Sequence, residues 1–294
     1  MTPHWSLETG GSPTQAERLG ERIGVGGVVS RADAAADAAI SFEAVSKWFR
    51  RKDRLVHALS RVSLDVRQSE FVSLIGPSGC GKSTMLRLAG GLLEPDRGSI
   101  VVNNQSPAEA RRQKRYGFVP QHPALLPWRT VRRNVSLLSD VNRQQENPGM
   151  STDDQLAMLD DIGLTPFLDS LPRELSGGLQ QRVSIARAFA LGAPVLLMDE
   201  PFSALDEITR ADMRYLLLHL WGKIGSTVLF VTHSIPEAVV LSDRVAVLGS
   251  RPGRITQVID VSLPRPRHAG VEDSDDYHRV LGEVRAALRQ GWSS

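Results

Sequence analysis

The most constraining feature of this sequence is a glycine-rich octapeptide that stands between an apolar run and a helical pattern. It reads Gly-Pro-Ser-Gly-Cys-Gly-Lys-Ser over residues 76–83 and fits the pattern G-x-x-x-x-G-K-[ST]. The apolar run Phe71–Ile75 ends directly before it, and a helix is predicted over Lys82–Gly90. Glycines let the backbone turn so that successive N–H groups face a phosphate, and a helix N-terminus adds a favourable dipole. The chain is therefore expected to place a strand, a phosphate loop and a helix in that order.

Each residue type in this loop has an expected role. Lys82 would reach the β- and γ-phosphates of a nucleotide, and the hydroxyl of Ser83 would bind Mg²⁺. A chance match is the alternative, which the flanking strand and helix disfavour. Cys80 is predicted to be a small filler, although a helix N-terminus lowers a thiol pKa and would open it to modification without nucleotide. The expected nucleotide-binding residues here are Gly76, Pro77, Ser78, Gly79, Cys80, Gly81, Lys82, Ser83 and Thr84.

Two acidic residues end a second apolar run. The run Val195–Met198 leads directly into Asp199 and Glu200. In α/β proteins, ligands gather at the C-terminal ends of the strands, so a buried strand would deliver both carboxylates to that edge. We expect Asp199 to hold Mg²⁺, through water, and Glu200 to act as the general base on the attacking water. The alternative is that both acids begin a helix before Pro201, but the phosphate loop upstream favours the first interpretation.

The middle of the chain alternates short apolar runs with helical patterns, which is typical of an α/β sheet covered by helices. Strands are predicted at Phe71–Ile75, Ser99–Val102, Gly117–Pro120, Val195–Asp199, Thr227–Val231 and Val245–Leu248. Helices are predicted at Lys82–Gly90, Asp153–Ile162, Gly177–Leu191, Asp206–Gly222 and Pro236–Leu241. Before the first of these helices, Ile40–Phe49 and Leu55–Val66 are expected to form antiparallel strands.

Two terminal segments differ from this core. Residues 1–40 are rich in alanine and glycine and have no sustained periodicity, so we expect a disordered N-terminal tail. Residues 265–294 begin with Arg-Pro-Arg, continue through an acidic run and contain a short amphipathic helical pattern. We expect them to form a C-terminal tail with a short helix, which leaves residues 41–264 as the folded domain.

Composition excludes several classes of protein. The 294 residues carry 35 Lys and Arg against 33 Asp and Glu, a formal charge of +2, so no strong basic field marks a nucleic-acid partner. Cys80 is the single cysteine, which excludes a disulfide within the chain and allows a reducing compartment. No apolar run approaches the roughly 20 residues that span a bilayer. We expect a soluble chain, or one that reaches a membrane only through a partner.

The sequence Leu-Ser-Gly-Gly-Leu-Gln-Gln-Arg at 175–182 makes the assignment more specific. It resembles the signature motif of ABC-type ATPases, apart from Leu179, where the family commonly has glutamine. The resemblance extends over the whole core, because Gln121 resembles the Q-loop glutamine, Ser203–Asp206 the D-loop and His233 the switch histidine. Taken singly, Gln121 and His233 would be a polar loop residue and a core histidine. The presence of all these motifs in the family's order favours the family roles instead.

The resemblance implies a P-loop NTPase fold, with a RecA-like core, an antiparallel β subdomain and an α-helical subdomain that carries the signature. It implies that two domains pair head to tail, with ATP between the phosphate loop of one and the signature motif of the other. A homodimer is expected, and a different ATPase subunit as the second domain is the alternative. Phe49, with Trp48 as second choice, would stack on adenine. The resemblance implies further nucleotide contacts for Ser176, Gly177, Gly178 and, at the dimer interface, Asp206. It implies catalytic roles for Glu200, His233, Gln121 and Lys82. It implies Mg²⁺ contacts for Ser83, Gln121 and Asp199.

Two shorter stretches narrow the resemblance. Leu-Pro-Trp-Arg at 126–129 and Arg-Pro-Gly-Arg at 251–254 are similar to those in the ATPase subunits of bacterial importers for nitrate, sulfonates, taurine and related compounds. This resemblance implies an ATP-hydrolysing subunit that is peripheral at the cytoplasmic face of the cell membrane. Its partners would be an integral membrane permease and, indirectly, an extracytoplasmic solute-binding protein.

Other classes remain as alternatives. An ATPase subunit of an exporter is the most serious of them. The DNA-repair ATPases of the same family carry a long coiled coil, for which the 55 residues from Gln121 to Ser176 are too few, and those of translation usually carry two phosphate loops. Small-molecule kinases and GTPases share the phosphate loop but have no place for a signature motif.

Overall fold

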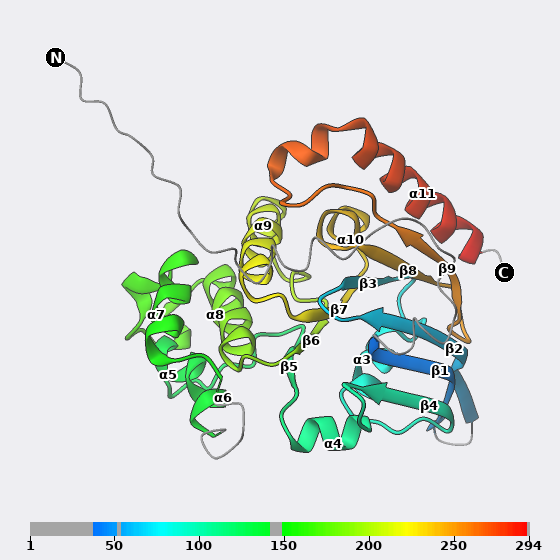
Figure 1. The fold of residues 1–294 in the computed structure, drawn as a ribbon, viewed down its shortest axis with the longest axis horizontal. Helices are drawn as coiled ribbons and strands as arrows, with labels where there is room; N and C mark the ends of the chain where they lie inside the picture. The colour runs from blue at the N-terminus through cyan, green and yellow to red at the C-terminus, as the bar shows by residue number, and fades with distance from the viewer. Residues whose placement is uncertain (1–37, 52–53, 142–148, 293–294) are drawn as a thin grey trace, which may run out of the picture.

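A six-stranded sheet forms the centre of the molecule (Figure 1). The computed structural model describes residues 38–51, 54–141 and 149–292, and the statements below concern these residues. The strand order is β5-β6-β7-β3-β8-β9, in which β9 alone runs antiparallel to its neighbour. The strands are β3 (Phe71–Ile75), β5 (Tyr116–Val119), β6 (Val195–Asp199), β7 (Thr227–Thr232), β8 (Arg244–Leu248) and β9 (Ile255–Asp260).

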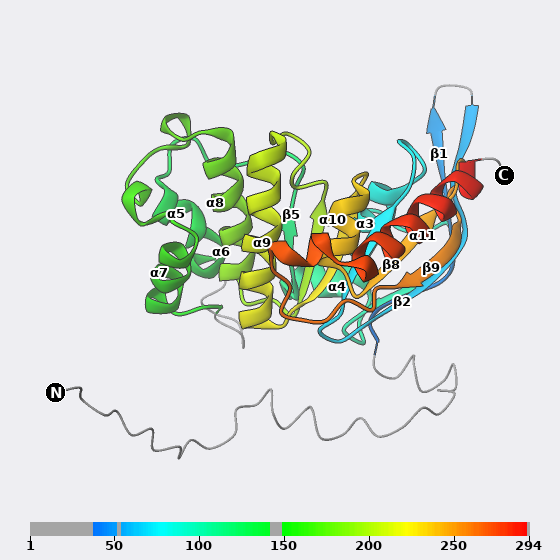
Figure 2. The same ribbon diagram turned by 90° about the horizontal axis from the view of Figure 1, so that it is seen from above.

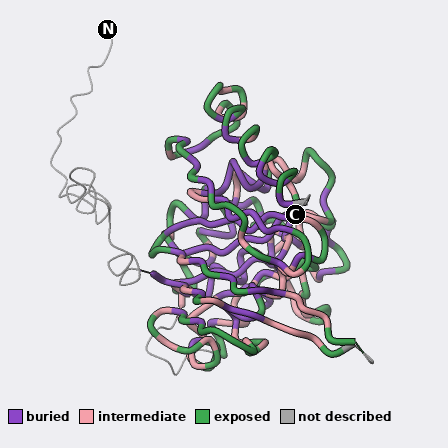
Figure 3. Tube along the Cα trace, turned by 90° about the vertical axis from the view of Figure 1, so that its right-hand side faces the viewer, coloured by how far each residue is buried: buried purple, intermediate pink, exposed green. Residues whose placement is uncertain are grey.

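The strands β3, β6 and β7 are buried along their whole length and are mostly apolar, because both faces of the sheet are covered. Alternate side chains enter two different cores, as the pleat of a strand requires. Phe71 and Ile75 of β3 pack in a core with the helices on one face, whereas Val72 and Leu74 pack with a second, smaller sheet on the other. Buried stretches of the chain accordingly converge on this sheet (Figure 3).

The smaller sheet is antiparallel and has the order β2-β1-β4. It consists of β1 (Ala38–Arg51), β2 (Arg54–Arg67) and β4 (Arg97–Val102). Between the two sheets lies α3 (Lys82–Ala89), whose apolar side chains share a core with both of them. The register of β1 and β2 places Phe49 opposite Val56, near the end of the hairpin at which the two strands are connected. This sheet is the predicted antiparallel β subdomain.

The remaining helices form two groups (Figure 2). One group gathers beyond β5, at the side away from the small sheet, and corresponds to the predicted α-helical subdomain. It comprises α5 (Val131–Val135), α6 (Leu137–Asp140), α7 (Thr152–Asp161) and α8 (Gly177–Ala190), with the 3₁₀ turns η1 (Thr165–Phe167) and η2 (Pro172–Glu174). The other group covers the central sheet and comprises α9 (Glu207–Ile224), α10 (Ile235–Leu241) and α11 (Asp275–Trp292); α4 (Pro107–Arg112) lies beside β4.

The predicted C-terminal segment 265–294 contains the expected helix, but its described residues pack against the domain and do not form a separate tail. Helix α11 has 18 residues, and its side chains Val280 and Val284 are buried in the main core. The helix packs on α10, β8 and β9, and η3 (Ala269–Asp273) precedes it. Arg267 is also buried, and its guanidinium donates to the backbone carbonyls of Val240 and Ser242, at 2.9 and 2.7 Å. The segment is part of the domain.

The predicted N-terminal boundary also shifts. Strand β1 begins at Ala38, three residues inside the predicted tail, and Ala39 and Ile40 are fully buried in the small-sheet core. Residues 1–37 lie outside the described residues, so the expectation of disorder there stays a prediction.

Candidate active site

A cavity of about 540 Å³ opens where the phosphate loop meets the small sheet, and we call it the phosphate-loop site. The end of β3, the start of α3 and the hairpin β1–β2 form its walls. Its lining residues are Phe49, Arg50, Val56, Ala58, Ser78, Gly79, Gly81, Lys82, Ser83, Thr84, Glu200 and Arg251. The cavity combines apolar groups on the hairpin side with backbone and charged groups on the loop side, which suits a nucleotide better than a small ion.

The phosphate loop owes its shape to two glycines. Gly79 has a φ of +75° and Gly81 a φ of +109°, and residues other than glycine rarely adopt such backbone conformations. Gly81 also begins α3, and no side chain caps the first turn of that helix. The N–H groups in the first turn of α3 therefore point to a position where an anion can bind. Lys82 is buried, and its Nζ donates to the carbonyls of Gly76 and Pro77, at 2.8 and 3.2 Å.

Ser83 and Asp199 meet at the floor of this region. The Oγ of Ser83 donates to Oδ1 of Asp199 at 2.7 Å, which joins α3 to the end of β6. Burial raises the pKa of Asp199 above its usual value, and the hydrogen bond from Ser83 opposes that shift. Among the described residues, no group of three or more His, Cys, Asp or Glu could hold a metal alone. Two oxygen donors fit Mg²⁺, which commonly binds one or two carboxylates and completes its shell with substrate phosphates and water.

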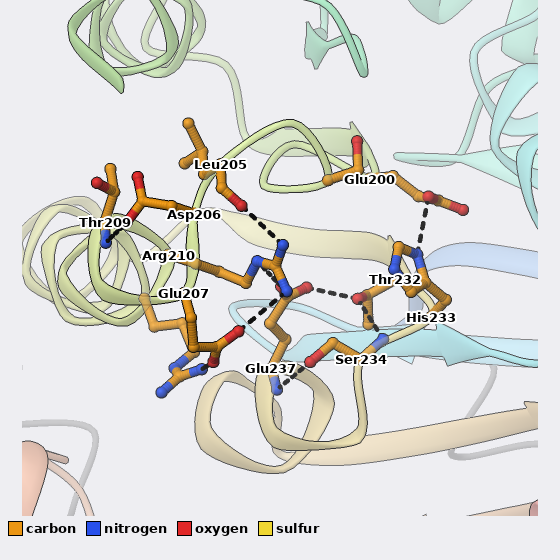
Figure 4. Close-up of polar contacts among 12 residues, drawn as sticks. Glu200, Leu205, Asp206, Glu207, Thr209, Arg210, Thr232, His233, Ser234 and Glu237 are labelled. Carbon is orange, nitrogen blue, oxygen red and sulfur yellow. Dashed lines mark hydrogen bonds and ion pairs between the residues drawn. The ribbon is translucent and has the colours of Figure 1, made fainter. Parts of the chain in front are cut away.

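Glu200 follows Asp199 and turns toward the cavity. Its N–H donates to the carbonyl of Val231 at 2.9 Å, and its φ is +44°, an uncommon conformation for a residue other than glycine. Such strain persists where surrounding contacts impose it, and it is frequent at functional sites. The Oε2 atom of Glu200 lies 3.0 Å from Nδ1 of His233, which stands at the end of β7 (Figure 4). The structure thus brings together two predicted catalytic residues 33 positions apart.

A chain of polar contacts extends from this pair toward α9 (Figure 4). Thr232, next to His233, donates its hydroxyl to the carboxylate of Glu237. Glu237 is buried, which raises its pKa, and it forms an ion pair at 3.7 Å with Nε of Arg210 on α9. Arg210 in turn donates to the carbonyl of Leu205 at 2.8 Å. The segment Ser203–Asp206 is therefore linked by polar contacts to Thr232, the residue next to His233.

A second cavity of about 380 Å³ lies at the N-terminus of α8 and shares no lining residue with the first, and we call it the signature site. Ser176 caps α8 through a hydrogen bond from the N–H of Leu179, at 3.3 Å, and the first turn of α8 holds no acid. Asp206 caps α9 in the same way, and the N–H of Thr209 lowers the pKa of that carboxyl. The lining residues are Ser176, Gly177, Gly178, Leu179, Arg182, Ala204, Leu205, Asp206 and Thr209.

Three expected residues depart from their predicted surroundings. Gln121 is exposed and donates to Oγ of Ser203 at 3.2 Å, so it does not line the phosphate-loop site. Cys80 belongs to the phosphate loop, but it is buried, and burial raises the pKa of its thiol. This contradicts the expectation of a thiol activated by the helix N-terminus and agrees with a small residue that fills space. Trp48 stacks on His57 with ring centroids 4.4 Å apart, which leaves Phe49 as the aromatic on the cavity wall.

Several lining residues were missed by the sequence analysis. Val56 and Ala58 follow from the hairpin register, which an alignment of the two predicted strands across their turn could have revealed. Thr209 lies one helical turn after Asp206, within reach of a capping argument. Arg251 comes from the turn between β8 and β9, and no local pattern indicated that this turn reaches the phosphate loop.

Comparison with known proteins agrees with this geometry. The ABC transporter family model matches residues 59–203. An ATP-binding protein of Brucella abortus is 44% identical over 79% of this chain and 87% of its own length. The aliphatic sulfonates import ATP-binding protein of Bacillus cereus is 36% identical, over 86% of this chain and 96% of its own. The nitrate import ATP-binding protein of Synechococcus elongatus is 43% identical over 79% of this chain, a match that spans 35% of that longer protein.

Among solved structures, the dimeric post-hydrolysis state of an ATP-binding cassette bound to ADP and phosphate is 33% identical. The match has a TM-score of 0.66 and covers 76% of this chain and all of that one. The chain belongs to the ABC transporter family, as an ATP-binding subunit with ATPase activity. The predicted P-loop NTPase fold is confirmed. None of the helices in the described part of the chain is both long and apolar enough to cross a bilayer.

Proposed function

We propose that this chain hydrolyses ATP in a head-to-tail homodimer, with each ATP held between the phosphate-loop site of one copy and the signature site of the other. The observation that carries the proposal is the presence of both sites on one chain, as two cavities without a common residue. A site that is divided in this way within a monomer is completed by a second copy. The dimeric cassette bound to ADP and phosphate supports this arrangement.

Within the phosphate-loop site we assign binding roles to four features. The uncapped N-terminus of α3 and the loop amides bind the phosphates, and Phe49 stacks on the adenine ring. Lys82 leaves its two carbonyl partners to bind the β- and γ-phosphates. Ser83 and Asp199 would hold Mg²⁺, a cation that would neutralise phosphate charge.

Catalysis is assigned to Glu200 and His233. Glu200 accepts the proton of the attacking water as general base, and its contact with Nδ1 of His233 fixes the position of the carboxylate. His233 is more than half exposed and is free to contact the γ-phosphate. Gln121, two residues after the end of β5, would link Mg²⁺ or water to the transport partner, for which it would have to give up its hydrogen bond to Ser203.

The signature site completes the cage from the opposite copy. Ser176 and the amides of Gly177 and Gly178 present donors at the N-terminus of α8, where the absence of acids in the first turn favours an anion. Asp206 lies at the dimer interface beside them. Leu179 replaces the common glutamine without loss of this anion site, because its side chain packs on the main core.

We further propose that the dimer drives uptake of a small solute of the nitrate, sulfonate or taurine kind. It would act at the cytoplasmic face of the membrane, on a separate integral permease, with a solute-binding protein as an indirect partner. The names of the sulfonate and nitrate import relatives support this reading. An exporter subunit is the second candidate, and a soluble ATPase of DNA repair or translation the third; no nucleic-acid partner is proposed.

Affinity purification of the full chain from a mild-detergent membrane extract tests this proposal. An importer subunit is expected to recover a polytopic permease in a two-to-two complex, with ATPase activity that rises when the solute-binding protein carries its solute. Recovery of nucleic acid or ribosomes, without a permease, would contradict it. Activity that rises with a substrate added from the cytoplasmic side would instead favour the exporter.

A further inference from the structure

The turn between β8 and β9, which carries the Arg-Pro-Gly-Arg sequence, forms part of the phosphate-loop site. Arg251 lines the cavity, and its Nε donates to the carbonyl of Gly79 at 2.7 Å. Gly79 lies in the middle of the phosphate loop. The turn therefore brings a guanidinium to the loop from a segment about 170 residues further along the chain.

The backbone of this turn is fixed on two sides. The N–H of Gly253 donates to the carbonyl of Ala58, and the N–H of Ser60 donates to the carbonyl of Gly253, both at 2.9 Å. Gly253 also lies so close to the phosphate loop that a Cβ atom there would be 1.9 Å from the carbonyl oxygen of Cys80. The position of Arg251 is thus set by backbone contacts with β2 and the phosphate loop.

The charge of Arg251 has no partner in the part of the chain that the structure describes. No carboxylate forms an ion pair with it, and one N–H of its five donors is used in the bond to Gly79. Three cations, Arg50, Lys82 and Arg251, line the cavity against the single carboxylate of Glu200. An exposed, fixed guanidinium with free donors at the edge of a phosphate site is suited to bind phosphate oxygens.

We propose that Arg251 is a nucleotide-binding residue that donates hydrogen bonds to the phosphate groups of ATP. The guanidinium lies between the loop carbonyl and the phosphates, so that the β8–β9 turn becomes a further wall of the nucleotide site. This inference rests on the proposed binding of ATP at the phosphate-loop site.

Titration of the full chain with ATP, ADP and adenosine, in the presence of Mg²⁺ and at low temperature, tests the inference. Arg251→Ala is expected to weaken the binding of ATP by about tenfold, which equals about 1.4 kcal/mol. Adenosine carries no phosphate, so its affinity should change by less than about twofold. Arg251→Gln keeps an N–H donor for Gly79 but removes the charge, and it should lose as much ATP affinity as the alanine variant.

Two further variants separate charge from local structure. Arg251→Lys keeps the charge without the planar fork and should recover most of the affinity, to within about threefold of the wild type. Arg254→Ala is the matched control, because Arg254 lies in the same turn, is exposed and does not line the cavity. Melting of each nucleotide-free variant shows whether the turn still holds the loop.

An unchanged ATP affinity in both Arg251→Ala and Arg251→Gln would overturn the inference. An equal loss for adenosine and ATP would also overturn it, because it would show that Arg251 only holds the loop in place. If the wild-type chain itself fails to bind ATP, the proposed function fails instead. The two failures are therefore distinguishable in one series of titrations.

Discussion

The phosphate-loop site and the signature site differ in how far a single chain completes them. In the first, the functional side chains already contact one another: Lys82 binds loop carbonyls, Ser83 binds Asp199, and Glu200 lies beside His233. In the second, Ser176 and Asp206 only cap their own helices. A Cβ atom added at Gly177 would meet nothing within 4 Å.

This difference indicates a division of work. On the proposed function, the organised interior of the phosphate-loop site would bind and position a nucleotide before the partner arrives, which would lower the cost of ordering it later. The signature site is an open rim of helix N-termini, and we expect its donors to gain a ligand only when a second copy presents one. We therefore expect one site to govern binding and chemistry and the other to govern association. Substitutions should separate the two functions.

The largest effect is expected from Glu200→Gln, which removes the general base and keeps an oxygen acceptor for His233. Turnover should fall by roughly 10²- to 10⁴-fold, because general base catalysis contributes about that much, while ATP affinity stays near the wild type. Steady-state phosphate release and ATP titration measure the two quantities. Glu94→Gln, an exposed acid that lines neither site, is the control. Turnover near the wild-type rate would remove Glu200 from the proposed role.

Gly177→Arg should abolish association while the folded monomer persists. The new side chain meets no atoms within 4 Å in one chain, but it would occupy the space proposed for the partner's nucleotide. We expect self-association with ATP to weaken by at least about 100-fold, or about 2.7 kcal/mol. Light scattering of the Glu200→Gln background with ATP measures it. Gly222→Arg is the matched control, since Gly222 is another helical glycine with open space. A dimer that survives Gly177→Arg would refute the head-to-tail geometry.

Lys82→Ala should weaken nucleotide binding by roughly 10- to 100-fold, because it removes a charge-assisted contact. The loss is expected in the isolated chain as well as in the assembled complex, which would place it in the phosphate-loop site alone. Binding of ADP to the isolated chain, followed by calorimetry, measures this effect without a contribution from the signature site. An unchanged affinity would mean that the loop amides suffice to bind the phosphates and that the lysine acts later in the reaction.

Features that are local in the sequence were predictable. The apolar runs Phe71–Ile75 and Val195–Asp199 match β3 and β6 to the residue, because a central parallel strand buried on both faces leaves a continuous apolar signal. Strand β9 was missed because it lies at the sheet edge and is mostly exposed, which weakens that signal. The start of β1 was missed because Ala38 and Ala39 have little intrinsic preference for strands.

Features that depend on tertiary packing were not predictable. The spacing of Val280 and Val284 indicated an amphipathic helix, but no pattern showed that α10, β8 and β9 offered a face to cover it. In the site, the two motif residues Lys82 and Glu200 both line the cavity, because Glu200 directly follows β6 and Lys82 begins α3 after the short loop that leaves β3. Arg251 escaped notice because its place depends on contacts with β2 and the phosphate loop.

The smallest expected effect, Asp199→Asn, concerns the energetic cost of preparing the phosphate-loop site. Burial raises the pKa of Asp199, so the ionised carboxylate destabilises the nucleotide-free fold. This destabilisation appears as the pH rises from the pKa of the Asp199 carboxyl in the unfolded chain to its higher pKa in the folded chain. Asparagine keeps an acceptor for Ser83 and carries no charge. We expect the melting temperature at neutral pH to rise by about 1–4 °C, corresponding to about 1 kcal/mol.

The difference between this variant and the wild type should shrink as the pH falls toward about 4, because the folded carboxyl, whose pKa is raised, takes up its proton at a higher pH than the unfolded one. Asp96→Asn is the opposite control, because Asp96 accepts from the N–H of Trp48 and its pKa is lowered. That variant should melt slightly lower. Magnesium with ATP should reverse the order, since the carboxylate of Asp199 gains a cation and the amide does not. A lower melting temperature for Asp199→Asn without nucleotide would show that the carboxylate stabilises the empty site, and the comparison of a prepared site with an open one would then need a different physical basis.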